Sequence, residues 1–434
     1  MAELREPTNS SQPVELGADP ADCYSDPELL PAEEALRRID AALETVATVE
    51  QVHIRGALDR VLAADVASPL DVPGFTNSAM DGYAIVGEDL TAAADASIEL
   101  VVRGTSWAGK PFPEPVSPGQ CVRVMTGAVM PTGTDTVVMQ EHVERDGDRV
   151  RLEPNHRIGQ NVRQAGEDLR RGKTVLPTGR RLLPAELGLL ASLGVGEVPV
   201  RRRLRVATFS TGDEIRSLGQ PLEPGQIYDS NRYTLFGMLT RLGVEVIDLG
   251  VIPDRADAIE AAFAEASACS DVVITSGGAS ASEADFVAQT LRDLGEVGFW
   301  RIAIRPGRPL AFGRIGDAFV FGLPGNPVAV MVTFYQFVQP ALRLMQGERD
   351  ARPVPMLQAR ASEDLRKKPG RVEYYRAVVS RTREGELTVA QTGKSGSALL
   401  HTMSDANCFI VLPEESDTVK AGAWVDIQPF FGLA

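Results

Sequence analysis

The spacing of apolar residues predicts helices in two separate parts of the chain. The first begins at Pro31, since proline is well tolerated in the first turn of a helix. Its apolar residues lie three or four positions apart, which places them on one face: Leu36, Ile39, Leu43 and Val46. A second helix is predicted from Pro184 to about Leu193. The two helical segments, residues 27–68 and 170–200, are separated by a region of different character.

That intervening region, residues 69–169, is rich in glycine and proline and consists of short alternating segments. Asp146 and Gly147 form a turn signal between two β-type runs, which is typical of a hairpin. The region therefore predicts a β-rich domain. At the N-terminal end, residues 1–26 are acidic, rich in serine and proline, and poor in aromatic side chains, so we expect a disordered tail.

Residues 201–348 alternate between β-type and helical patterns. Apolar strand-like runs are expected at 204–209, 244–249, 271–275, 297–304, 309–314 and 318–322, and helices at 231–242, 256–268, 285–294 and from Pro327 towards Met345. Such alternation predicts a doubly wound α/β domain with a mainly parallel sheet and helices on both faces. The last segment, 352–434, returns to a β pattern with a Glu384-Gly385 turn and predicts a small barrel or sandwich.

Composition and charge narrow the possible functions. A chain of 434 residues is expected to form several domains. Its net charge of −15 argues against nucleic acid as a general partner. The sequence lacks both a leader and 18–20 uninterrupted apolar residues, so we expect a cytoplasmic protein without a membrane span. The four cysteines and four histidines are scattered, so a metal site would use oxygen ligands, which favour magnesium.

Several acidic residues follow predicted strands of the α/β domain, where such sheets bind ligands. Glu214 follows the first strand, Asp254 the second, and Asp285 lies at a helix start after the third. Three converging carboxylates would repel one another unless a cation joins them, which predicts a metal site. Asp285 alone would be an ordinary acid at a helix N-terminus. The loop Ser276–Ser280 contains Gly277 and Gly278, which suit either a phosphate or a simple tight turn.

A cluster of arginines is the second candidate site. Alternation along the predicted strand places Arg301, Ala303 and Arg305 on one face, and a Pro-Gly turn brings Arg308 nearby. They are either surface arginines paired with local acids or an oxyanion site, because guanidinium groups match tetrahedral anions. Between a strand and the last long helix, Pro324 and Pro327 form a rigid turn that could shape a flat pocket for a ring system.

Six motifs in order carry a resemblance to the MoeA family, which includes the E domain of gephyrin. They are DVPGFTNSAMDGYA (71–84), VRVMTGAVMPTGTDTVVMQE (122–141), FSTGDE (209–214), GQIYDSNR (225–232), TSGGASASEAD (275–285) and FGLPGNPVAV (321–330). The resemblance covers roughly residues 30–434. It implies a helical linker and dimerisation domain interrupted by the β-rich insertion, and an elongated homodimer. In such a dimer we expect the last domain of one chain to face the α/β domain of the other.

The resemblance also implies functional positions. As catalytic residues it marks Asp81, Thr126, Asp168, Glu214, Arg301 and Arg305. As substrate-binding residues we take Ser276, Gly277, Gly278, Ser280, Arg308, Pro324, Pro327, Arg376 and Ser397, and as metal ligands Glu214, Asp254 and Asp285. Without the resemblance, Asp81 would be a turn former, Asp168 a solvated acid and Thr126 part of a turn at a strand end.

The implied activity is insertion of molybdate into adenylylated molybdopterin with release of AMP, using Mg²⁺. The resemblance also implies a molybdopterin adenylyltransferase as partner. Two features depart from the family: arginines at 301 and 305 replace the lysines often present there, and Ser282 stands where glycine is usual. Two alternative functions are considered for this chain. One is the molybdopterin adenylyltransferase activity, which needs only the α/β unit. The other is a non-catalytic scaffold role like that of gephyrin.

Overall fold

The computed structural model describes residues 29–93, 97–277, 286–349, 351, 355–393 and 396–432. The predicted acidic tail lies outside these residues. The chain forms two compact units, residues 1–48 with 201–434, and residues 49–200. Each unit is described by itself.

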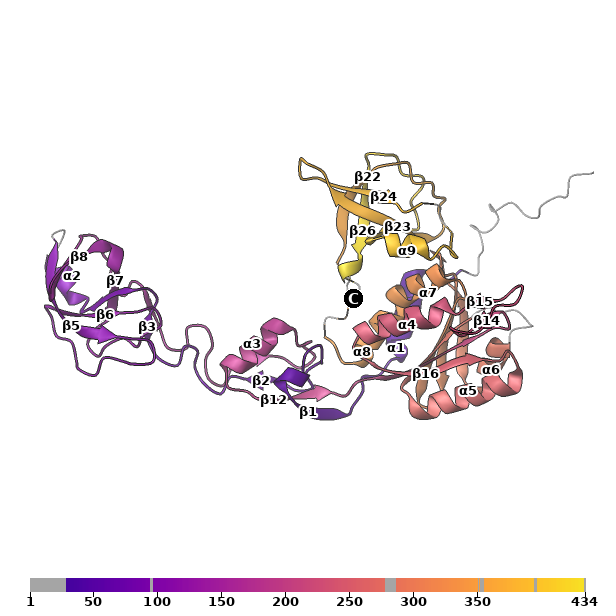
Figure 1. The fold of residues 1–434 in the computed structure, drawn as a ribbon, viewed down its shortest axis with the longest axis horizontal. Coiled ribbons are helices and arrows are strands. Elements are labelled where there is room, and N and C mark those ends of the chain that lie inside the picture. Colours follow the sequence, from indigo (N-terminus) through magenta and orange to yellow (C-terminus); the bar gives the residue numbers. More distant parts are fainter. Residues whose placement is uncertain are drawn as a thin grey trace, which may run out of the picture. The chain divides into compact units, whose positions relative to one another are not determined.

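The first unit contains the α/β domain (Figure 1). Its six-stranded sheet has the order β16-β13-β17-β21-β20-β18. The strands are β13 (Arg205–Thr211), β16 (Glu245–Ile252), β17 (Val272–Ser276), β18 (Glu296–Arg301), β20 (Pro309–Ile315) and β21 (Ala318–Leu323). The first four in this order are parallel, and β20 and β18 are antiparallel. The mainly parallel sheet is therefore confirmed.

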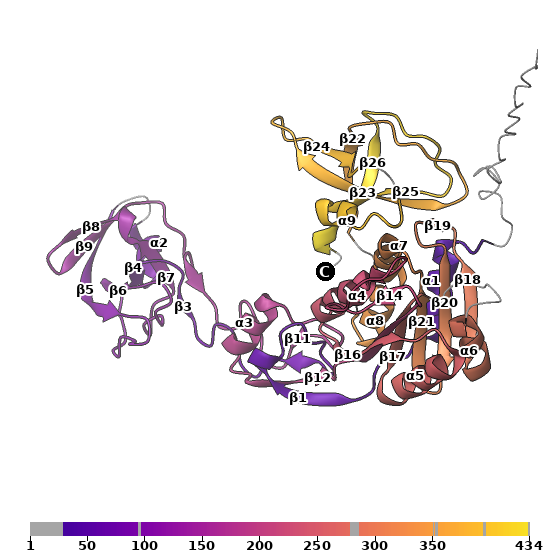
Figure 2. The same ribbon diagram turned by 45° about the vertical axis from the view of Figure 1, so that its right-hand side comes forward.

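Helices cover both faces of this sheet, as Figure 2 also shows. Side chains of α5 (Ala256–Cys269) and α6 (Phe286–Leu294) join one apolar cluster. Those of α1 (Ala32–Ala42), α4 (Ser230–Arg241), α7 (Pro327–Thr333) and α8 (Gln339–Met345) join the other. Helix α1, expected with the linker, packs into the α/β core, because its apolar face meets the sheet side that carries Val206 and Phe321.

The last long helix runs continuously from Pro327 to Met345. Between α7 and α8 it widens into a π-helical turn, η4 (Phe334–Val338), just before Pro340, which cannot donate a backbone hydrogen bond to the preceding turn. Among the described residues this helix of 19 residues is the one apolar and long enough to cross a membrane, and 72% of its most apolar stretch is buried inside the protein.

The C-terminal domain is a closed barrel. Its five strands are β22 (Leu357–Ala361), β23 (Val372–Arg381), β24 (Leu387–Gln391), β25 (Cys408–Leu412) and β26 (Trp424–Pro429). The sheet runs β23-β24-β22-β26-β25, and β25 pairs again with β23 and closes the ring. A short helix, α9 (His401–Asp405), precedes β25. Of the two forms left open by the sequence, the barrel is therefore the correct one.

The predicted continuous strand over 297–304 is wrong. It ends at Arg301, which pairs with Pro309 at the edge of the α/β sheet. Leu30 then bridges to Ile302, and its amide donates to the carbonyl of Arg301 at 2.8 Å. The next strand, β19 (Ile304–Arg305), joins β23 of the barrel in parallel. Arg301 and Arg305 therefore belong to two different sheets.

The second unit contains the inserted β-rich domain. Its six-stranded sheet has the order β7-β4-β6-β5-β9-β8. The strands are β4 (Gly82–Ile85), β5 (Ile98–Ser106), β6 (Gln120–Val124), β7 (Thr136–Met139), β8 (Val143–Asp146) and β9 (Arg149–Leu152). The last two form the hairpin predicted at Asp146-Gly147, and Gly147 has the positive φ that its turn requires. Helix α2 (Glu88–Ala93) follows β4.

The rest of the second unit is the linker on which the β-rich domain is inserted. It contains α3 (Pro184–Ser192) and two small sheets, β1 (Val49–His53) with β12 (Glu197–Arg201) and β2 (Val66–Ala67) with β11 (Thr174–Leu176). Two chain segments connect it to the β-rich domain and pair through β3 (Asn77–Ser78) and β10 (Val162–Arg163).

Candidate functional site

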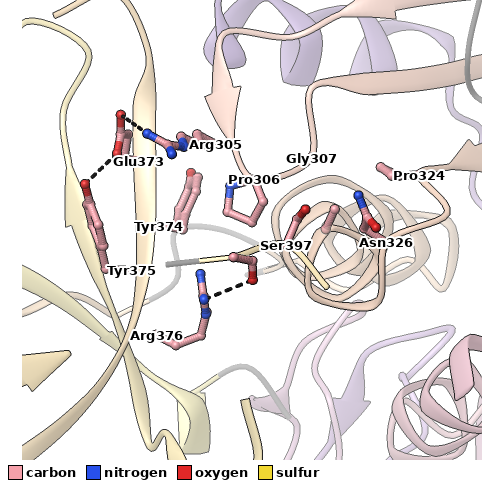
Figure 3. Close-up of a pocket in the computed structure, with 12 residues that line it drawn as sticks. Arg305, Pro306, Gly307, Pro324, Asn326, Glu373, Tyr374, Tyr375, Arg376 and Ser397 are labelled. Atoms are coloured by element: carbon pink, nitrogen blue, oxygen red, sulfur yellow. Dashed lines mark hydrogen bonds and ion pairs between the residues drawn. The ribbon is translucent and has the colours of Figure 1, made fainter. Parts of the chain in front are cut away.

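A cavity of about 380 Å³ lies in the first unit between the α/β domain and the barrel. Four short segments line it: Arg305 to Gly307 at the end of β19, Pro324, Asn326 and Ala329 around the start of α7, Glu373 to Arg376 of β23, and the loop residues Gly396 and Ser397. Figure 3 shows these side chains. We call this cavity the arginine pocket. It brings together four residues predicted from the sequence or from the resemblance: Arg305, Pro324, Arg376 and Ser397.

Arg376 is the more deeply placed of the two arginines. Its side chain is only 6% exposed. Its Nε donates to Thr402 Oγ1 at 3.1 Å and its Nη2 donates to the carbonyl of Gly396 at 3.1 Å. Burial lowers the pKa of Arg376, and the positive charge of Arg305 lowers it further. An arginine still keeps its charge here, because its ordinary pKa is far above neutrality.

The turn after Arg305 packs tightly against helix α7. Gly307 has a φ of +105°, and a Cβ at this position would lie 2.5 Å from Thr333 Oγ1. Thr333 is fully buried and its hydroxyl donates to the carbonyl of Ala329 at 2.8 Å. Only glycine therefore lets the turn approach the helix this closely, and this contact sets where Arg305 stands relative to the pocket.

A first prediction follows from this contact. We expect Gly307→Ala to lower the free energy of unfolding by about 2–4 kcal/mol, because it adds a steric clash to a strained φ. The matched control is Gly316→Ala, where φ is also positive at +57° but no atom lies within 4 Å of the added Cβ. That control should cost only about 1 kcal/mol. Urea unfolding of both variants measures the difference, and equal losses would contradict the close approach.

Other predicted residues of the α/β domain lie elsewhere. Arg301 and Arg308 are not among the described residues that line the arginine pocket. Pro327 occupies the first turn of α7, where proline fits. At the end of β17, Ser276 accepts a hydrogen bond from Asn231 at 3.2 Å, and Gly277 has a φ of +97°. Gly278, Ser280 and Asp285, like Ser282, lie outside the described residues.

Two of the three predicted metal ligands lie in the described part of the chain. Glu214 and Asp254 follow β13 and β16, which are neighbours whose last residues, Thr211 and Ile252, are in register. Carboxylates at adjacent strand ends suit a hard cation. The residues that the structure describes contain no group of three acidic, histidine or cysteine side chains that could hold a metal. The predicted set needs Asp285 as its third member.

In the second unit, Asp81 and Thr126, two residues marked by the resemblance, contact each other directly. One carboxylate oxygen of Asp81 accepts hydrogen bonds from the Thr126 amide at 2.7 Å and from its hydroxyl at 2.9 Å. These two bonds lower the pKa of Asp81. The next residue, Gly82, lies so close to β7 that a Cβ would stand 2.1 Å from the carbonyl oxygen of Val138. Asp168 lines a separate cavity with Asn77 and Arg163.

Several pocket residues were not identified from the sequence: Asn326, Glu373, Tyr374 and Tyr375. Glu373 is the most informative, because it is an acidic side chain that is only 2% exposed. Its place in the sequence could have drawn attention to it, because Glu373 lies three residues before the predicted Arg376 in the segment RVEYYR (371–376). Arg376 and Ser397 share their pocket with Arg305 of the same chain. That the last domain of one chain faces the α/β domain of a second chain stays a prediction.

Comparison with known proteins places these features in a family. Three family models match: the MoeA N-terminal region (domain I and II) over residues 30–194, the probable molybdopterin binding domain over 207–344, and the MoeA C-terminal region (domain IV) over 358–430. The molybdopterin molybdenumtransferase of Haemophilus influenzae is 43% identical over 403 residues, which cover 93% of this chain and 99% of that protein. The protein of the same name from Nostoc sp. is 37% identical, with 88% of each chain covered.

A solved structure agrees with these matches. The crystal structure of the molybdopterin biosynthesis moeA protein from Pyrococcus horikoshii has 31% sequence identity and a TM-score of 0.80, and the match covers 92% of this chain and all of that one. The match spans the α/β domain, the inserted β-rich domain and the barrel. The chain therefore belongs to the MoeA family.

Proposed function

We propose that this protein is a molybdopterin molybdenumtransferase that inserts molybdate into adenylylated molybdopterin and releases AMP during molybdenum cofactor biosynthesis. Relatives of that name align with nearly the whole chain. The barrel and the inserted domain match along with the α/β domain, which favours this enzyme over an adenylyltransferase built on the α/β unit alone.

The observation that carries the proposal is the meeting of Arg305, Arg376 and Ser397 in one pocket. Molybdate is a tetrahedral dianion, and guanidinium groups bind such oxyanions through paired hydrogen bonds. The burial of Arg376 strengthens its attraction for an anion, because less water screens the charge. Asn326 and Ala329 place the N-terminal end of the long helix at the same pocket, and the helix dipole there also favours negative charge.

Other predicted residues of the α/β domain are assigned to the adenylylated pterin and to its metal ion. Pro324 and the loop at Ser276 and Gly277 would hold the ring system and phosphate, and Glu214, Asp254 and Asp285 would hold Mg²⁺. Bound there, Mg²⁺ would polarise the phosphoanhydride that is cleaved. We further propose that the protein acts in the cytoplasm as a homodimer and receives its substrate from a molybdopterin adenylyltransferase.

Replacing one pocket arginine tests the assignment of molybdate to this pocket. We expect Arg305→Ala to raise the KM for molybdate by roughly tenfold or more, because one of two cations facing the anion is lost. The affinity for adenylylated molybdopterin should change much less. Steady-state AMP release at varied molybdate measures the first quantity, and calorimetric titration of the adenylylated pterin measures the second.

The matched control is Arg314→Ala, on strand β20. Arg314 is 40% exposed and its ion pairs are with the surface residues Glu44 and Asp317. Its loss removes a positive charge from the same domain without touching the pocket, so both quantities should stay unchanged. Equal losses for molybdate and pterin in Arg305→Ala would instead make Arg305 a general phosphate contact.

A further inference from the structure

The arginine pocket contains a buried carboxylate that the proposed chemistry does not use. Glu373 lies on β23, lines the pocket and is 2% exposed. Its Oε2 lies 2.7 Å from the hydroxyl of Tyr375, as Figure 3 shows. Tyr375 is itself 7% exposed, and its hydroxyl oxygen lies 2.6 Å from the carbonyl oxygen of Arg366, so these two acceptors share the single hydroxyl proton. The carboxylate is therefore held in place by buried neighbours.

The other oxygen of Glu373 faces Arg305. The distance from Arg305 Nη1 to Glu373 Oε1 is 3.7 Å, and the arginine side chain is 50% exposed. This distance is too long for a hydrogen bond, so the pair attracts through charge and does not fix the orientation of the guanidinium. The main effect of Glu373 on Arg305 is thus electrostatic: a carboxylate of the protein partly neutralises a cation assigned to the incoming oxyanion.

We propose that Glu373 is an internal competitor that sets the affinity of the arginine pocket for oxyanions. An entering dianion must draw Arg305 away from Glu373 and is itself repelled by that carboxylate, which Tyr375 holds in place. Glu373 therefore weakens the retention of any tetrahedral oxyanion, molybdate included. This inference rests on the proposed function, since it assigns Arg305 to the oxyanion.

The test removes the negative charge of Glu373 and keeps the size of its side chain. We expect Glu373→Gln to bind molybdate roughly two- to fivefold more tightly, the range expected when a half-exposed ion pair no longer has to be broken. Inorganic phosphate should gain affinity as well. Isothermal titration of the full-length chain with each anion measures both. If Glu373 instead served to position Arg305, the same variant would bind both anions more weakly.

Stability must be followed separately, because Glu373 also influences Lys367. That lysine is 4% exposed, and its Nζ donates to the carbonyls of Lys368, Glu414 and Ser416 at 3.0–3.2 Å. Burial lowers the pKa of Lys367, and the charge of Glu373 acts in the opposite direction. We therefore expect Glu373→Gln to unfold at a lower temperature than the parent. If it does not fold, Glu373→Asp keeps the charge but withdraws it from Arg305, and it should also bind molybdate more tightly.

The matched control is Glu348→Gln. Glu348 is 7% exposed and forms a two-point salt bridge with Arg343, away from the pocket. This variant should lose stability and leave molybdate affinity unchanged. Combining Glu373→Gln with Arg305→Gln tests the mechanism, since without Arg305 only the direct repulsion between Glu373 and the anion remains, and the gain should be smaller. A full gain in the Arg305→Gln background would overturn the competition.

The outcomes for the two proposals are separable. A folded parent protein that does not bind molybdate would count against the oxyanion pocket itself. A parent that binds molybdate, together with Glu373→Gln at equal or weaker affinity, would overturn only the role given to Glu373.

Discussion

Asp285→Asn is expected to reduce magnesium-dependent AMP release by about 100-fold or more while the protein remains folded. Asparagine keeps the size of the side chain and removes one of the three charges proposed to hold the cation. Weaker metal binding leaves the phosphoanhydride without its polarising charge. AMP release measured over a range of magnesium concentrations, with thermal unfolding in parallel, gives both quantities.

A surface carboxylate nearby in the chain provides the control. Asp257, in the first turn of α5, is 74% exposed and pairs with Arg255. Asp257→Asn removes the same charge from the same domain and should leave AMP release unchanged at every magnesium concentration. If Asp285→Asn instead shows the parental rate at every magnesium concentration, Asp285 is not a metal ligand and the three-carboxylate site is refuted.

Much of the α/β domain could be predicted from local pattern. Helix α4 ends at Arg241 and is followed by Gly243, whose φ is +72°, as the glycine stop in the sequence indicated. Strand β17 is buried along its full length and begins with the apolar run Val272 to Ile274, which is easily recognised. In these elements the residues that determine the structure are close together in the sequence.

The features that local pattern left open or predicted wrongly depend on distant partners. Whether the last domain is a barrel or a sandwich is decided by the pairing of β25 with β23, whose paired residues run from Glu373 with Leu412 to Ala377 with Cys408. Period-two alternation is the same in both forms. The strand over 297–304 was predicted as continuous because its alternation is continuous. It breaks because Leu30 pairs at Ile302 and β23 pairs at Arg305, two contacts with segments far away in the sequence.

The arginine pocket also combines residues that local pattern identifies with contacts that only distant segments create. Arg305 was found from its own pattern and Arg376 through the resemblance, but neither revealed that they share a cavity. Glu373 was missed because an acidic residue in a β strand is normally assigned to the solvent face. Here strand alternation places it with Tyr375, whose ring belongs to the barrel core, while Tyr374 joins the core of the α/β domain.

The burial of Arg376 leads to the last prediction, a dependence on pH created by Arg376→Lys. Burial and the charge of Arg305 lower the pKa of the group at this position. Arginine remains charged despite this, whereas a lysine ammonium starts from a much lower pKa and shifts readily when buried. The introduced ammonium is a cation below its pKa and loses its proton as pH rises. We therefore expect kcat/KM for molybdate in Arg376→Lys to fall at least about tenfold between pH 6 and 9.

The parent protein and a second lysine variant distinguish this effect from other pH effects. Arg305→Lys makes the same substitution in the same pocket, at a side chain that is 50% exposed. Solvent keeps that ammonium near its ordinary pKa, so its profile should follow the parental profile over this range. If Arg376→Lys also follows the parental profile, the introduced ammonium keeps its proton, and position 376 is better solvated than its 6% exposure indicates. A fall confined to Arg376→Lys would show that molybdate transfer requires a permanent positive charge at the buried position, which arginine supplies and lysine does not.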